Sequence, residues 1–344
     1  MSDHNIFNRE NLMKSCCASD IETAEKILRS GVSPTKNIDG MKTCQVMIES
    51  IKSGHLNIVK LLVSYGAPLN LWDMNGYMFT PLMTAIRHGH VDIVDYLLEN
   101  IDKGIDLNEI GKYEHTAFSL ACREERIDCI DRLIAAGCSV NRVKNFIDSE
   151  HPIISTLEDT ETKEYICIDI LDKLIVNGAK IQVHNKRRQT TPLYLAYRAN
   201  RLKVVEKLLA YGYNGMKFQT DRDLALHACL DNKSEMLKIF LKYNMSLDVL
   251  SANDDTLLSS ACSLGYIEIV KILLENNYID INEKNSDGTT ALMAAVSENN
   301  LEITKILIDY GADIKITDND GDNAFNYAED TCLNYLLQIK KKIH

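Results

Sequence analysis

Apolar and polar residues alternate with a helical period over residues 80–98. Leu82 and Ile86 share one face of the first half, and a second apolar stripe at helical spacing follows Gly89. The hydroxyl of Thr80 can cap the first helix, and the proline directly after it suits the first helical position. The segment therefore predicts two short amphipathic helices joined by a turn at Gly89.

Two helices of this size cannot bury their own apolar faces, so they need neighbours of the same kind. The pattern recurs in register along the chain, at intervals of 32 to 40 residues. We call the positions equivalent to Thr80 anchors and number the repeats from one to ten. The anchors are Glu10, Thr43, Thr80, Thr116, His151, Thr191, Asp223, Thr256, Thr290 and Asn323. This repetition predicts a stack of similar helix pairs.

The punctuation of these repeats resembles that of the ankyrin repeat. The residues that carry the resemblance are Thr80-Pro81-Leu82 with Gly89-His90, Thr191-Pro192-Leu193, Thr290-Ala291-Leu292 and Gly54-His55. The resemblance covers about residues 8–337. It implies an all-α fold, an ankyrin-repeat solenoid of stacked helix-turn-helix units with hairpin loops. It also implies a scaffold that binds other proteins and catalyses nothing.

We expect a single ankyrin-repeat domain over residues 1–344, with an N-terminal cap at about 8–37, repeats over about 38–317 and a C-terminal cap at about 318–340. The repeat at about 144–184 is divergent, since His151-Pro152-Ile153 stands where Thr-Pro-Leu belongs. An acidic insertion near 159–165 is open to three interpretations: a solvated loop, a second contact site or a bend in the array. Two extra residues between Thr43 and Gly54 predict a longer or distorted first helix in repeat two.

Charge and motifs narrow the function. The chain has 49 acidic and 38 basic residues and a net charge of −11, which argues against a nucleic-acid binder, because such affinity rests on neutralising phosphates. No apolar run reaches membrane-spanning length, and the first residues do not resemble a secretory signal, so no membrane association is predicted. The sequence has no phosphate-binding glycine loop, metal-ligand motif or nucleophile elbow. We therefore expect no cofactor, no metal and no enzyme activity.

The ten cysteines indicate packing rather than chemistry. Four stand six residues after an anchor, where other repeats carry Ile, Tyr or Val: Cys16, Cys122, Cys229 and Cys262. A position that accepts these residues is a packing position. Without a CxxC pair or a zinc-spaced Cys/His set, the pattern predicts reduced structural thiols. The predicted location is cytoplasmic, with the nucleus, or a host cytosol for an effector, as alternatives.

The most unusual surface precedes the first helix of repeat three. From Gly66 to Thr80 the chain advances 14 residues, two more than in a regular copy. The extra length contains the only tryptophan, Trp72, with Tyr77 and Phe79 close in sequence. Exposed aromatic residues on a hairpin are typical anchors of protein interfaces. The alternative is that they cover the adjacent hairpin as local packing.

By resemblance, partner contacts also come from residues just before the anchor and from seven or eight residues after it. Over repeats three and four this predicts one aromatic and cationic patch, with an unused solvated surface as the alternative for any member: Trp72, Tyr77, Phe79, Arg87, His88, Tyr113, His115 and Arg123. A secondary candidate combines a basic hairpin tip with the arginine seven residues after the next anchor: Lys186, Arg187, Arg188 and Arg198. Arginine offers paired donors to carboxylates and phosphates, although a charge run at a loop tip is commonly just solvated.

These observations predict a monomeric, non-enzymatic scaffold or adaptor that binds a protein or peptide on its concave hairpin and first-helix face. A preorganised surface loses little ordering entropy on binding. One alternative is a pathogen effector or host-range factor of the same fold that targets a host protein, which the Ile-, Asn- and Lys-rich usage favours. Another is phosphate or nucleic-acid binding through the basic hairpin at residues 186–188.

Overall fold

A computed structural model describes residues 8–38, 41–73, 78–111, 115–141, 151–159, 161–185, 188–214, 218–245, 247, 251, 254–275 and 279–343. The chain divides into two compact bodies, Met1–Leu195 and Ala196–His344, which we call the N-terminal and C-terminal bodies. Each is built of helix pairs, as the repeat pattern predicts. The single domain with terminal caps stays a prediction.

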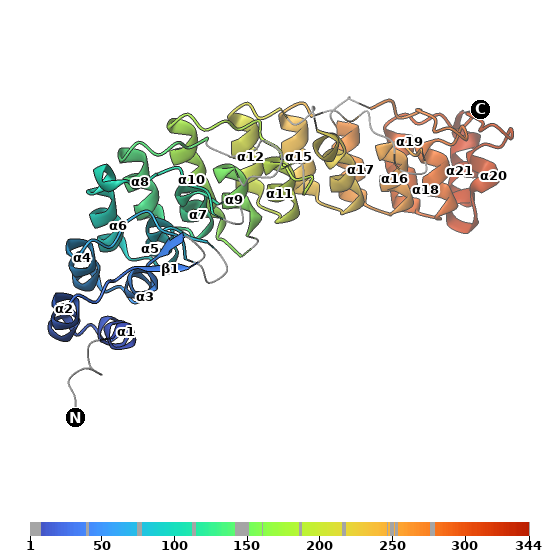
Figure 1. Ribbon diagram of the computed structural model, residues 1–344. Helices are drawn as coiled ribbons and strands as arrows, with labels where there is room; N and C mark the ends of the chain where they lie inside the picture. The colour runs from blue at the N-terminus through green and yellow to red at the C-terminus, as the bar shows by residue number, and fades with distance from the viewer. Residues whose placement is uncertain are drawn as a thin grey trace. The chain divides into compact units, whose positions relative to one another are not determined.

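In the N-terminal body the helices form two layers (Figure 1). The first helices of successive repeats pack on one another: α1 (Arg9–Cys17), α3 (Gln45–Lys52), α5 (Pro81–His88), α7 (Ala117–Arg123) and α9 (Pro152–Glu158). The second layer holds α2 (Ile21–Arg29), α4 (Leu56–Ser64), α6 (Val91–Leu98), α8 (Ile127–Ala135) and α10 (Glu164–Val176). The loops contain the antiparallel pair β1 (Lys36–Ile38) and β2 (Met41–Thr43), and the 3-10 turn η2 (Ile101–Lys103).

The C-terminal body repeats this arrangement. Its first helices are α14 (Leu224–Leu230), α16 (Leu257–Ser263), α18 (Ala291–Ser297) and α20 (Ala324–Tyr327). Its second helices are α12 (Leu202–Ala210), α15 (Ser234–Lys242), α17 (Ile267–Glu275), α19 (Leu301–Asp309) and α21 (Asp330–Ile343). The short α13 (Gln219–Arg222) precedes α14, and α11 (Pro192–Arg198) begins before the division between the bodies and ends after it.

Anchor threonines cap the first helices as predicted. The Thr80 hydroxyl accepts a hydrogen bond from the backbone N–H of Met83 at 3.3 Å, and four other anchors do the same: Thr116, Thr191, Thr256 and Thr290. The anchor Asp223, whose carboxylate could cap a helix as the threonine hydroxyl does, does not do so. Its backbone (φ −90°, ψ 3°) continues out of α13 instead of taking the extended conformation of a cap, and no side-chain cap bond forms.

The first helix of repeat two is neither longer nor distorted, so that prediction is wrong. The helix α3 has eight residues, as α5 has, and begins after Cys44. Thr43 instead ends β2, paired with Lys36. The extra residues therefore extend a strand, and the anchor of this repeat lies later than Thr43.

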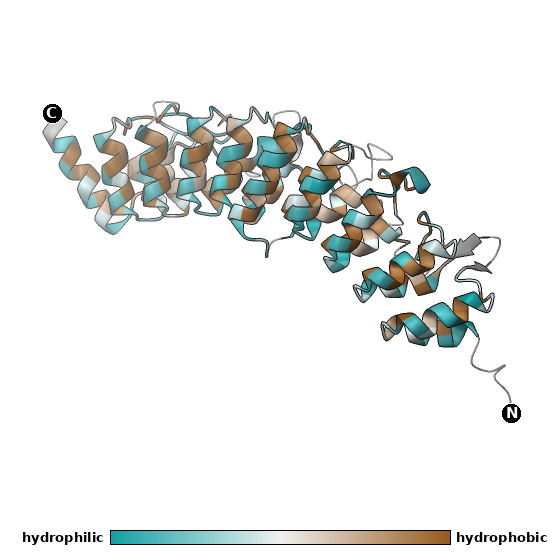
Figure 2. Cartoon of the chain, turned by 90° about the vertical axis from the view of Figure 1, so that its left-hand side faces the viewer, coloured by the Kyte–Doolittle hydropathy of each residue, from teal (hydrophilic) through white to brown (hydrophobic). Residues whose placement is uncertain are grey.

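Apolar stripes on the helices form the core, and Figure 2 shows them in brown beside polar faces in teal. The four cysteines that follow anchors are at most 1% exposed: Cys16, Cys122, Cys229 and Cys262. This confirms that their position is a packing position. All ten cysteines are free thiols. Burial raises the pKa of Cys16, Cys122 and Cys229 to about 12, which keeps them protonated and unreactive.

Hydrogen bonds at helix ends also join consecutive repeats. At several junctions the residue before a second helix donates to a carbonyl near the end of the first helix of the preceding repeat. The Nε2–H of His90 reaches the Lys52 carbonyl at 3.0 Å, and Arg126 Nη2 reaches the Arg87 carbonyl at 3.1 Å. Carbonyls at a helix C-terminus lack partners within the helix, so these donors satisfy their hydrogen-bonding capacity. A donor group at this place also interacts favourably with the negative end of the helix dipole.

The same two side chains, His90 and Arg126, explain why glycine stands at positions 54 and 89. A β-carbon on Gly54 would stand 2.7 Å from the His90 ring, and one on Gly89 would stand 3.1 Å from the guanidinium carbon of Arg126. Both glycines also have φ of +75°, a conformation that favours glycine. The helix-turn-helix signal at Gly89 thus reports a close contact between repeats.

Repeat five departs from the others after α9. Its second helix, α10, has 13 residues, and its first turn begins with Glu164 and Tyr165 of the predicted insertion. Thr162 is buried and Cys167 is fully buried, whereas Tyr165 is 66% exposed. The solvated-loop interpretation is therefore wrong for part of the insertion, which continues as helix and packs inward on one side.

His151 takes the place of the anchor threonine in repeat five. Its Nδ1 accepts from the backbone N–H of Ile153 at 3.3 Å, and its Nε2–H donates to Asn141 Oδ1 at 3.3 Å. Only the neutral imidazole can make both bonds. Burial, and secondarily Lys180, lowers the pKa of His151 to about 4.

This histidine predicts a pH dependence of stability. Its folded pKa lies below the ordinary value of 6.5, so its contribution is complete above about pH 6.5 and is lost as pH falls toward 4, by about 3 kcal/mol at most. His151→Asn keeps a capping side chain without the titration. Urea unfolding should therefore show a smaller loss of stability between pH 7 and pH 4.5 in the variant than in the wild type. Equal losses would contradict the assignment.

Candidate functional site

The loop before α5 carries the extra residues that the spacing from Gly66 to Thr80 indicates. The Asp73 N–H donates to the Phe79 carbonyl at 2.8 Å, and the two residues are six positions apart in the sequence. The corresponding bond in a regular copy, Asn285 to Thr289, spans four positions. The predicted patch therefore begins at an enlarged loop.

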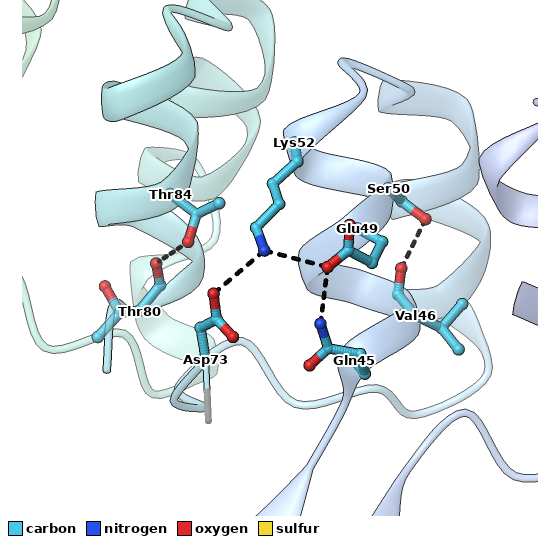
Figure 3. Close-up of polar contacts among 8 residues, drawn as sticks. All are labelled: Gln45, Val46, Glu49, Ser50, Lys52, Asp73, Thr80 and Thr84. Carbon is cyan, nitrogen blue, oxygen red and sulfur yellow. Dashed lines mark hydrogen bonds and ion pairs between the residues drawn. The ribbon is translucent and has the colours of Figure 1, made fainter. Parts of the chain in front are cut away.

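A polar network ties this loop to the preceding repeat (Figure 3). The Lys52 ammonium lies 3.0 Å from Glu49 Oε1 and 3.2 Å from Asp73 Oδ2, and Gln45 Nε2 donates to the same Glu49 oxygen at 2.7 Å. Asp73 is only 5% exposed. Burial alone lowers the pKa of Lys52, but the two carboxylates outweigh it, so the pKa is raised. This network holds Asp73, and Trp72, the residue before it in the sequence, is half-buried.

Two residues that were predicted to be exposed contacts for a partner are buried, so that part of the prediction is wrong. Phe79 is 4% exposed, because the Arg87 guanidinium lies 5.4 Å from its ring centre and Gly111 packs close to it. His115 is 6% exposed and accepts from Arg123 Nη1 at 3.4 Å. Each arginine seven residues after an anchor thus lies against the residue just before that anchor. Phe79 and His115 support the arginines and are not themselves presented to a partner.

The remaining members of the patch fall into two groups. Arg123 and His88 are exposed and Arg87 is half-buried, so all three can meet a partner. The ring centres of His88 and His90 are 6.3 Å apart, with planes 5° from parallel. Burial lowers the pKa of His88, and neighbouring basic groups lower it further. Tyr77 and Tyr113 lie outside the described residues.

The residues of the secondary candidate are divided between the two compact bodies. Lys186 and Arg187 lie outside the described residues. Arg188 is exposed, but its guanidinium pairs with Glu158 at the end of α9. Arg198 is also exposed, at the end of α11, and belongs to the other compact body.

Reasoning from sequence missed Lys52, Asp73 and Arg126. Lys52 stands two residues before Gly54, as Arg87 stands two residues before Gly89. Placing the anchor at Thr43 hid this equivalence, whereas alignment on Gly54-His55 reveals it. The N-terminal body therefore carries a basic residue near the end of three consecutive first helices: Lys52, Arg87 and Arg123.

A hollow of about 590 Å³ lies in the C-terminal body, between α19, the loop that follows it and α21. Its walls include Ile308, Ile314, Phe325 and Ile339, and Lys340 Nζ lies 5.1 Å from the Phe325 ring centre. Within the described ranges, no group of three or more His, Cys, Asp or Glu residues is placed to hold a metal ion. The hollow is mainly apolar and is remote from the predicted patch in sequence.

Family models agree with the repeated helix pairs. Models of ankyrin repeats in three copies match residues 12–110, 79–144, 163–249 and 215–285, and a model of ankyrin repeats in many copies matches 276–328. The chain belongs to the ankyrin-repeat family. Ankyrin repeats are protein–protein interaction modules, and the family is generally non-enzymatic. In the part of this ankyrin-repeat chain that the structure describes, no helix is long and apolar enough to cross a bilayer.

Relatives of this ankyrin-repeat chain include animal, viral and fungal proteins. It is 27% identical over 81% of its length to the ankyrin repeat and KH domain-containing protein mask-1 of Caenorhabditis elegans, covering 10% of that protein. It is 25% identical over 90% of its length to the putative ankyrin repeat protein FPV022 of fowlpox virus, covering 54% of it. The chain thus spans at most about half the length of these relatives. The human ASB11 ankyrin repeat domain aligns with 85% of the chain and 96% of that domain, at 21% identity and a TM-score of 0.39.

The Lys52 network predicts a local stability effect. Lys52→Met keeps the aliphatic stem but removes the cation from the buried Asp73, so stability should fall by about 1–2 kcal/mol. Trp72 is the only tryptophan and adjoins Asp73, so its fluorescence during urea unfolding reports on this loop. Glu49→Gln, at the more exposed partner, should change stability by less than about 0.5 kcal/mol. Equal effects from the two variants would contradict the assignment.

Proposed function

We propose that this chain binds a protein or peptide segment across the ends of the first helices in its N-terminal body. The contact residues in this proposal are Trp72, Arg87, His88 and Arg123. One observation carries it: the two arginines are each held against a buried side chain, Phe79 or His115. The same proposal keeps the predicted monomeric and cytoplasmic state, with no catalysis.

Preorganisation explains why these residues suit binding. Association costs about 0.5–1.5 kcal/mol for each flexible side chain that must be ordered. Here the arginine stems are already held over their supports, and the Lys52–Asp73 network holds the segment that carries Trp72. Tryptophan and arginine are also the residue types that most often dominate binding energy at interfaces. The face thus combines suitable side chains with a low ordering cost.

In a second candidate function, the protein comes from a pathogen and its partner is a protein of the host. The likeness to fowlpox virus and mimivirus ankyrin-repeat proteins supports a pathogen effector that binds a host protein. The nematode relative fits the first candidate equally well. Both candidates use the same face, so one experiment tests the shared claim. Phosphate or nucleic-acid binding at residues 186–188 receives less support, because Arg188 already pairs with Glu158.

Trp72→Ala should weaken binding by about 2 kcal/mol with little loss of stability. Peptides that bind the wild-type chain are selected from a displayed random library, and the affinity of a selected peptide is then measured for each variant. Tyr310→Ala, at an exposed aromatic residue of the C-terminal body, is the matched control and should leave affinity unchanged. If every selected peptide binds Trp72→Ala as tightly as the wild type, the proposed face is wrong.

A further inference from the structure

Repeat ten is built differently from the repeats before it, and the hollow in the C-terminal body lies at its end. Its first helix, α20, has four residues and its second helix, α21, has 14, whereas α18 and α19 in repeat nine have seven and nine. After α19 the chain turns at Gly311 into a loop. Counted from the helix start, α21 is still helical at the corresponding place, where Ile339 and Lys340 line the hollow (Figure 1). The hollow therefore lies between a regular loop and an extended helix.

Lys315 stands at a loop position that carries a bridging asparagine in other repeats. It lies four residues after Gly311, as Asn108 lies four residues after Gly104. The Oδ1 of such an asparagine accepts from a backbone N–H of the next loop, at 2.8 to 3.1 Å, in three pairs: Asn108 with Ser139, Asn141 with Lys180, and Asn282 with Asp313. The Lys315 ammonium has no acceptor atom, so it cannot make this bond. Its side chain lines the hollow instead.

The hollow combines apolar walls with exposed cations. Ile314 is only 8% exposed, and three further large apolar side chains that are half-buried also line the hollow: Ile308, Phe325 and Ile339. Lys315 and Lys340 are exposed, and Lys340 Nζ lies 5.1 Å from the Phe325 ring centre. A lysine can lay its aliphatic stem along apolar surface while its ammonium stays in water. Apolar surface and positive charge thus occur together at one place.

The charged side chains that line the hollow include one more cation than anion. The two ammonium groups of Lys315 and Lys340 stand against one carboxylate, Asp313, whose Oδ1 accepts from the backbone N–H of Lys315 at 2.8 Å. Asp309, in the last turn of α19, does not line the hollow but lies near Tyr335. A ligand head group with a single negative charge would balance this set, whereas a doubly charged phosphate would exceed it.

We propose that this hollow binds a small amphipathic carboxylate, with its aliphatic chain against the apolar walls and its carboxylate between Lys315 and Lys340. A volume of about 590 Å³ lies in the range of about 300–1,000 Å³ that is typical of small-molecule sites, which combine apolar walls with a few polar groups. Burial of the chain supplies affinity, and the ammonium groups orient the head group. The inference is independent of the proposed partner-binding face, which belongs to the other compact body.

The test uses isothermal titration calorimetry on the full chain, with soluble amphiphiles kept below the concentrations at which they form micelles. Decanoate is the probe, and decyltrimethylammonium and decyl glucoside carry a cationic and a neutral head group on a chain of the same length. We expect decanoate to saturate a single site and to bind at least about tenfold more tightly than decyltrimethylammonium, with lower affinity as salt rises. Unspecific adsorption would give the opposite order, because the whole chain has a net charge of −11.

Chain length adds a readout for the apolar walls. Each methylene group that enters the hollow should tighten binding by about fourfold at most, because burying it removes apolar surface from water. Affinity should therefore rise from hexanoate through octanoate to decanoate. A contact made only between the carboxylate and the lysines would give the same affinity for all three.

Matched variants locate the binding. Lys315→Asn restores the residue type of the other loops, and Lys340→Gln removes the second charge; both side chains are exposed, so the fold should survive. Together they should weaken decanoate about tenfold and leave decyl glucoside unchanged. Lys305→Gln, at an exposed lysine of α19 that does not line the hollow, is the control and should have little effect. Ile339→Gln should weaken both amphiphiles, and circular dichroism with urea unfolding checks that each variant is folded.

Four results would overturn the inference: no saturable binding of decanoate, binding of decyltrimethylammonium as tight as that of decanoate, equal affinity of hexanoate and decanoate, or a loss with Lys305→Gln equal to that of the double variant. The first also covers adsorption of many molecules to the surface without a defined site. None of these results bears on the partner-binding face, which the Trp72→Ala experiment tests separately.

Discussion

The structure depends on the inability of a single helix pair to bury its own apolar surface. A helix of eight or nine residues gains little from intrinsic propensity, so packing must hold it in place. Within each compact body the first helices of successive repeats pack on one another, and side chains such as Ile86 and Cys122 are buried in these layers. The stack is therefore the unit of stability, and each repeat contributes mainly through its neighbours.

Helix ends place a second constraint on the stack. A left-handed glycine follows three of the first helices, at Gly54, Gly89 and Gly265, and its missing β-carbon leaves room for a side chain from the next repeat. That side chain can be His90, Arg126 or Asn300, because any of them fills the space above the glycine. The geometry is fixed, but the charge is free to vary. The charge of the surface at this position can thus change without altering the packing beneath it.

Local sequence signals were sufficient for much of the fold. Thr80, Pro81 and Gly89 act through bonds within one helix or turn, so their roles could be read directly. The spacing of the cysteines identified core positions because the same position recurs in each repeat and carries Cys, Ile, Tyr or Val. Errors arose where a distant residue decides the outcome. Thr43 resembles an anchor, but its pairing with Lys36 makes it part of a strand.

The candidate site was predicted less well than the fold. Whether a surface residue is exposed depends on whether a long side chain from a neighbouring residue lies over it. Phe79 and His115 stand at loop positions where an aromatic side chain is expected to project, yet Arg87 and Arg123 cover them. Sequence spacing shows that these residues are neighbours on the surface but does not show which lies on top. An arginine carries its charge at the end of a long apolar stem, so it covers an aromatic ring and keeps its head in solvent.

This arrangement changes the character of the surface. An aromatic patch would bind through apolar contact, whereas arginines supported by buried rings bind through directed hydrogen bonds and charge. The support matters as much as the charge, because an unsupported arginine would have to be ordered on binding. The groups that this face presents to solvent therefore depend on which side chain lies uppermost, a property of the packed structure and not of the sequence pattern alone.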